Sequence, residues 1–140
     1  MSQDLFYIRF FSRWMLAIVF TMAGFWKVFE LTATTHANNF FVGGYKDTWI
    51  PEFLLLTLGY IIPYWELAGG LLLAVGYKSR EVAISFAGLL LITTYGHALK
   101  EPLFDIDGHT FTRLILIFIV LAIAHKNDYL TVDGYLIDKK

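Results

Sequence analysis

Four apolar stretches, separated by shorter polar or Gly/Pro-bearing segments, dominate the pattern along the chain. They cover about residues 6–29, 53–75, 82–99 and 111–125. A helix needs about 20 mostly apolar residues to cross the hydrocarbon core of a bilayer, so the third and fourth stretches are short. The pattern predicts an all-α integral membrane protein, a bundle of four transmembrane helices in a single domain covering residues 1–140. A short stretch could instead form a buried or re-entrant helix.

The longest interruption between apolar stretches covers residues 31–51. It is rich in Thr, Asn and Gly and contains the run Phe40-Phe41-Val42-Gly43-Gly44-Tyr45. Aromatic side chains gather at membrane–water interfaces. We therefore expect an irregular outer loop that lies on the interface or packs over the bundle.

The distribution of basic residues predicts the orientation of the spans. With four spans, the two termini and the second loop share one side. Cytoplasmic loops carry an excess of Lys and Arg. The side with the termini holds seven basic residues and the other side holds four: Arg9, Arg13, Lys78, Arg80, Lys126, Lys139 and Lys140 against Lys27, Lys46, Lys100 and Arg113. Both termini are therefore predicted to be cytoplasmic.

Composition supports the membrane interpretation and excludes several function classes. The sequence is 57% hydrophobic and 16% charged, with a mean hydropathy of +0.58. Soluble domains are about 25% charged, so the lipid bilayer is the expected partner for much of this surface. A net charge of −1 and no basic stripe argue against nucleic acid binding. Because cysteine is absent, redox chemistry would need a bound cofactor or a partner.

Ionisable residues inside apolar stretches are costly in a membrane and are candidates for function. Counting 1.5 Å per residue from the basic residues on the cytoplasmic side places the four candidates roughly 18–26 Å up, in the outer half of a core about 30 Å thick. They are Lys27, Glu66, His97 and Arg113. One carboxylate and up to three cationic groups therefore share a similar depth.

Three interpretations of this cluster remain open. In the first it is structural: Lys27 and Glu66 form a buried ion pair, Arg113 snorkels to the outer headgroups and His97 bonds a carbonyl. In the second, the residues line a pocket for an anion or a quinone headgroup, open to the outer leaflet. In the third, Glu66 and His97 transfer protons within the membrane.

No metal site is expected. The run from Asp105 to His109 is similar to the start of a calcium loop, but the downstream Glu that such a loop requires is missing. His36, His109 and His125 have no metal-ligand spacing between them. An acidic turn and isolated loop histidines are the simpler interpretation.

Two motifs and a short ending resemble those of the DoxX family. The first lies within residues 13–27, the second within residues 63–80, and the ending is Leu130-Thr131-Val132-Asp133. Two departures are that Ala17 stands where a glycine is expected and that residues 36–52 match no family pattern. The positions that carry the resemblance are Arg13, Gly24, Lys27, Pro63, Glu66, Gly69, Gly70, Gly76, Arg80 and Asp133.

The resemblance implies a four-helix fold and a place in the bacterial cytoplasmic (inner) membrane. Related members resemble the small membrane subunit of thiosulfate:quinone oxidoreductase or the membrane protein needed to mature methylamine dehydrogenase. We therefore expect a subunit of a quinone-linked envelope redox complex, with other membrane or periplasmic subunits, or a second copy of itself, as partners. The resemblance implies no covalently bound cofactor. It does imply a bound quinone.

The alternative function is a membrane scaffold or assembly factor that docks a periplasmic or membrane partner. A small transporter is a weaker third hypothesis, because four short helices offer little volume and no inverted repeat is visible. Stand-alone catalysis is not expected, since the chain shows no catalytic triad, phosphate-binding loop or metal cluster. At most it is a subunit of an oxidoreductase.

Overall fold

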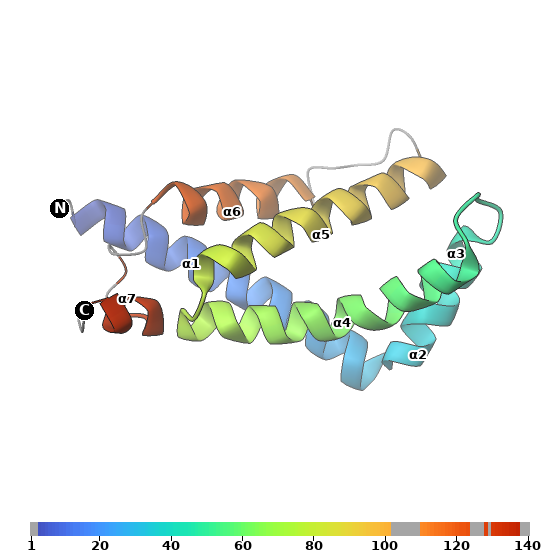
Figure 1. Cartoon of the computed structure of the whole chain (residues 1–140), viewed down its shortest axis with the longest axis horizontal. Helices are drawn as coiled ribbons and strands as arrows, with labels where there is room; N and C mark the ends of the chain where they lie inside the picture. Colours follow the sequence, from blue (N-terminus) through green and yellow to red (C-terminus); the bar gives the residue numbers. More distant parts are fainter. Residues whose placement is uncertain (1–2, 102–109, 124–127, 129, 138–140) are drawn as a thin grey trace.

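A computed structural model describes residues 3–101, 110–123, 128 and 130–137, and the regular structure in these residues is helical throughout. Four helices run along the long axis of the molecule (Figure 1). They are α1 (Gln3–Phe25), α4 (Glu52–Val75), α5 (Ser79–Lys100) and α6 (Thr112–Ala122). Short α7 (Val132–Ile137) lies at the same end as the start of α1 (Figure 1).

Three helical segments are long and apolar enough to cross a membrane. They are α1 with its π-helical extension η1 (Trp26–Glu30), together Gln3–Glu30, then Glu52–Val75 and Ser79–Lys100. α6 is apolar but has only 11 residues, or roughly 16 Å at 1.5 Å per residue. Its predicted end at residue 125 lies outside the described residues. The orientation of the termini stays a prediction.

The segment expected to be an irregular outer loop is largely helical, which corrects that expectation. It contains α2 (Ala33–Thr35), the π-helical η2 (His36–Val42) and α3 (Gly43–Tyr45). The Thr32 side chain begins this segment by accepting a hydrogen bond from the Thr35 backbone N–H. The segment packs on α4 at Gly59, where an added Cβ would lie 2.9 Å from the Ala37 Cβ. Small residues therefore allow it to fold back on the bundle.

Glycines on α1 and α4 let these two helices approach closely. A Cβ added at Gly24 would lie 2.8 Å from the Leu67 Cβ, and one at Gly70 would lie 3.0 Å from the Thr21 Cα. Small residues at such contacts are common in membrane helix packing, because van der Waals contact drives the association. Pro63 is buried inside α4, a position that membrane helices tolerate when neighbours satisfy the backbone.

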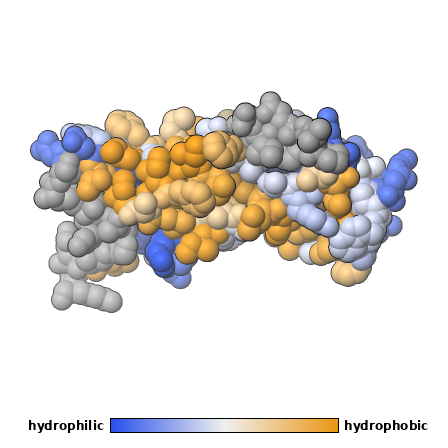
Figure 2. Space-filling model, turned by 90° about the horizontal axis from the view of Figure 1, so that it is seen from above, coloured by the Kyte–Doolittle hydropathy of each residue, from blue (hydrophilic) through white to orange (hydrophobic). Residues whose placement is uncertain are grey.

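The core lies between α1, α4, α5 and α6. The Phe20 and Phe86 rings stack with their centroids 3.8 Å apart. Gly69 on α4 leaves space for the Phe86 ring. Outside the core, Figure 2 shows an apolar surface over the middle of the molecule and hydrophilic residues toward both ends. A bilayer would cover such a surface, as expected for a membrane protein.

Candidate ligand-binding site

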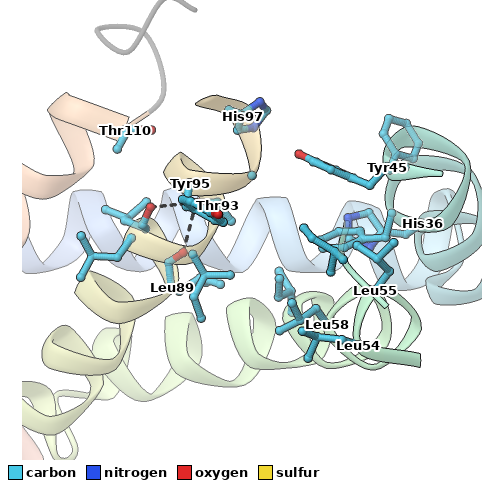
Figure 3. Close-up of a pocket in the computed structure, with 18 of the residues that line it drawn as sticks. His36, Tyr45, Leu54, Leu55, Leu58, Leu89, Thr93, Tyr95, His97 and Thr110 are labelled. Carbon is cyan, nitrogen blue, oxygen red and sulfur yellow. Dashed lines mark hydrogen bonds between the residues drawn. The ribbon is translucent and has the colours of Figure 1, made fainter. Parts of the chain in front are cut away.

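A cavity of about 760 Å³ lies between α4, α5, η1, the start of α6 and residues 33–45, which we call the folded-back segment. Most of its lining is apolar or aromatic, with leucines from α4 and α5 on its walls (Figure 3). Small-molecule sites in proteins are typically about 300–1,000 Å³, mostly apolar, with a few placed polar groups. The cavity meets both criteria.

All four ionisable residues singled out from the sequence line this one cavity. Lys27 comes from η1, Glu66 from α4, His97 from α5 and Arg113 from α6. The structure thus places the four groups around one cavity, and it shows contact between Lys27 and Glu66. Whether they bind a ligand stays a prediction.

Lys27 and Glu66 form an ion pair. Lys27 Nζ lies 2.5 Å from Glu66 Oε2, and the two side chains are 21% and 5% exposed. An ammonium has three N–H donors, and a carboxylate has two acceptor oxygens. One hydrogen bond therefore leaves donors on Lys27 and acceptor capacity on Glu66 for a molecule in the cavity.

Arg113 lines the cavity against an aromatic ring. Its guanidinium carbon lies 5.5 Å from the centroid of Phe20, and its side chain is half-buried. Among the described residues, no carboxylate lies within ion-pair distance of it. The structure places Arg113 on the cavity wall, and its snorkelling to headgroups stays a prediction.

The folded-back segment adds two polar residues that the sequence interpretation did not select. His36 is only 6% exposed, and its Nδ1 lies 2.8 Å from the Gly59 carbonyl oxygen. Because a carbonyl only accepts, Nδ1 carries the proton. Burial lowers the pKa of His36, which favours the neutral ring, and burial raises the pKa of Tyr45. The Tyr45 hydroxyl reaches α5, since a Cβ added at Gly96 would lie 2.9 Å from it.

A sequence signal for this segment exists but is weak. Aromatic residues recur four positions apart within it, and their rings lie close, at 5.9 Å for His36 and Phe40 and 6.3 Å for Phe41 and Tyr45. Such spacing is typical of one helix face. The Thr, Asn and Gly content of the segment masked that signal.

A second group of charged residues lies far from the cavity, at the end of the bundle near α7. Arg13 Nε donates to Asp128 Oδ2 at 2.8 Å, and Arg13 Nη1 donates to the Leu73 and Ala74 carbonyls at the end of α4. Arg9 donates to carbonyls at the end of α6, namely Val120 and Ile123. Helix C-termini leave carbonyls without partners and carry a partial negative charge, so the two guanidinium groups cap both helices.

The remaining motif residues at this end join α7 to α5. Asp133 accepts hydrogen bonds from the backbone N–H groups of Lys78 and Ser79, each at 2.8 Å, which satisfies free donors at the start of α5. Gly76 adopts a φ of +69° after α4, a conformation suited to glycine. Arg80 is exposed. Of the residues that resemble the family motifs, Lys27 and Glu66 line the cavity and Arg13, Gly76, Arg80 and Asp133 lie at this end. Gly24, Gly69 and Gly70 lie at helix contacts between them.

No group of three or more potential metal ligands occurs within the described part of the chain. Asp105, Asp107, His109 and His125 lie outside that part, so the interpretation of the acidic turn stays a prediction. The chemistry of the cavity rests instead on cationic donors, one carboxylate and aromatic surface.

Comparison with known proteins identifies the family. The DoxX family model matches residues 8–98, a range that includes Lys27 and Glu66 as well as Arg13 and Gly76. No curated protein and no solved structure matches the chain significantly. The match covers more than half of the sequence, and three of the described helices are suited to crossing a bilayer. The chain is a membrane protein and belongs to the DoxX family.

Proposed function

We propose that the chain is the quinone-binding membrane subunit of a redox complex in the bacterial inner membrane, without catalysis of its own. The observation that carries this proposal is the mainly apolar cavity in which Lys27, Glu66, His97 and Arg113 share one lining. In this proposal the bundle crosses the membrane four times, with both termini in the cytoplasm.

The chemistry of a quinone fits the lining. Its ring and prenyl tail are apolar, and its two carbonyl oxygens need hydrogen-bond donors. Lys27 and Arg113 are donors, and Phe40, Phe41 and Tyr45 offer aromatic surface on which a ring can stack. The cavity therefore provides both parts of the recognition that a quinone requires.

Electrons would reach the quinone from a partner. The sequence has no cysteine, so no dithiol couple is available within the chain. A second membrane or periplasmic subunit, or another copy of this chain, would carry the redox group that exchanges electrons with the quinone. The contribution of this chain is to bind the ring, orient it and hold it at a fixed depth.

The direct test is the quinone content of the purified protein. The full chain is purified from a bacterial membrane in mild detergent, and extracted quinone is quantified against protein by mass spectrometry. We expect near-stoichiometric quinone in the wild type and a strong loss in Lys27→Met, because the variant removes donors from the lining. Lys46→Met is the matched control, since Lys46 is exposed and outside the lining.

Two outcomes would contradict the proposal. One is a wild-type protein without quinone, and the other is an equal quinone content in Lys27→Met and Lys46→Met. A stoichiometric protein partner that co-purifies without any quinone would instead support the scaffold or assembly factor.

A further inference from the structure

The described residues of the cavity lining include more cationic side chains than carboxylates. Among its described residues, Lys27 and Glu66 pair with each other, and burial favours the neutral form of His36. Lys100 and Arg113 remain as cations in the lining, and neither has a carboxylate within ion-pair distance in the part of the chain that the structure describes. Within the described residues, the lining therefore holds more cationic side chains than carboxylates.

Arg113 carries the donors that an anionic head would need. Its guanidinium carbon lies 5.5 Å from the centroid of Phe20, and the N–H groups of a guanidinium form a planar fork that suits two acceptor oxygens. A half-buried cation at membrane depth is costly, and among the described residues no carboxylate forms an ion pair with Arg113. A bound anion would offset that cost and accept from the fork.

Lys100 adds a second cation at a more exposed position. Its Nζ lies 5.3 Å from the centroid of the Tyr45 ring, and Tyr45 in turn reaches Gly96 on α5. The ammonium is therefore held beside the aromatic part of the lining. Positive charge beside a low-dielectric cavity raises the local concentration of anions.

We propose that the cavity selects an amphipathic ligand whose head is an anion, and that Arg113 is the specificity-determining residue. The proposal rests on the proposed function, and its first ligand class is a quinone with an ionised ring hydroxyl. The same chemistry, an anionic head on an apolar body, is also that of an acidic phospholipid. The two sources can be separated by experiment.

The test compares two probes with the same ring and tail. One is a 2-hydroxy-3-alkyl-1,4-naphthoquinone, which is ionised at neutral pH, and the other is its neutral 2-methoxy counterpart. Binding to the full chain in a non-ionic detergent is followed by quenching of tryptophan fluorescence, since Trp49 lines the cavity. We expect the wild type to bind the acidic probe about 10–100 times more tightly, the range for one hydrogen bond to a charged group.

Arg113→Gln should remove most of this preference while the neutral probe still binds, which shows that the variant is folded. Arg113→Lys keeps the charge but not the fork, so an intermediate preference is expected. Arg80→Gln is the matched control, because Arg80 is exposed and outside the cavity lining. It should leave the preference unchanged.

Equal affinity of the wild type for the two probes would overturn the selection of an anion while leaving a quinone site in place. Binding of neither probe would overturn the proposed quinone function. Competition distinguishes the sources: displacement of the acidic probe by phosphatidylglycerol, but not by phosphatidylcholine, would support the anion site and assign it to a lipid. An unchanged preference in Arg113→Gln would overturn the role of that residue.

Discussion

Asp128→Asn is expected to destabilise the protein by about 3–5 kcal/mol, the range for removing one partner of a buried ion pair. The Arg13 and Asp128 side chains are 0% and 1% exposed, and their atoms Nε and Oδ2 lie 2.8 Å apart. Without the carboxylate, the guanidinium of Arg13 would stay buried as an unpaired charge between α4 and α7. The free energy of unfolding in mixed detergent and SDS, followed by circular dichroism, measures the loss.

A double-mutant cycle tests the same pair. Arg13→Gln together with Asp128→Asn should cost less than the sum of the two single variants, because both single variants lose the same Arg13–Asp128 interaction. Arg9, whose Nε lies 3.6 Å from Asp128 Oδ2, loses its carboxylate in both variants that carry Asp128→Asn. Arg80→Gln is the control at the same end of the bundle and should lie within about 0.5 kcal/mol of the wild type, as surface substitutions do. Single variants as stable as this control would contradict the structural role of the pair.

Glu66→Leu is expected to lower stability by about 1.5–3 kcal/mol and to abolish quinone binding. The stability loss corresponds to one hydrogen bond between charged groups, and the 21% exposure of Lys27 lets its ammonium regain some solvation. Binding is lost because the carboxylate holds the ammonium at the cavity wall. Thermal unfolding in detergent and extracted quinone give the two readouts.

The double variant Lys27→Met with Glu66→Leu separates the structural role of the pair from its proposed binding role. Stability should recover, because similar apolar residues replace a buried ion pair at little cost. Quinone binding should not recover, because the polar groups remain absent. Recovery of both stability and quinone content would mean that the pair has only a structural role.

Three helices suited to crossing a membrane and four ionisable residues that line one cavity could be selected from the sequence because membrane physics acts on local sequence. Apolar length indicates a crossing helix, and a height of 1.5 Å per residue places ionisable groups at a depth. Lys27, Glu66, His97 and Arg113 thus stood out without knowledge of their packing. The resemblance to the DoxX family, which the family match over residues 8–98 confirms, added the positions of the close glycines.

The features that were missed depend on packing between segments distant in sequence. Residues 33–45 become helical where Gly59 allows Ala37 to approach α4, and nothing within the segment reveals that partner. Asp128 is buried as the ion-pair partner of Arg13, which lies 115 residues earlier in the chain. Such pairs have no spacing rule, so only the structure brings them together.

Photolabelling locates the proposed ligand most directly. An alkylated azidonaphthoquinone is irradiated with the full chain in bicelles, and labelled peptides are mapped by mass spectrometry with and without excess unlabelled quinone. We predict competed labelling at lining residues within 36–49 and 89–97, and none around Arg13 or Asp133. Labelling spread over the lipid-facing residues, or unaffected by the competitor, would contradict a quinone site in this cavity.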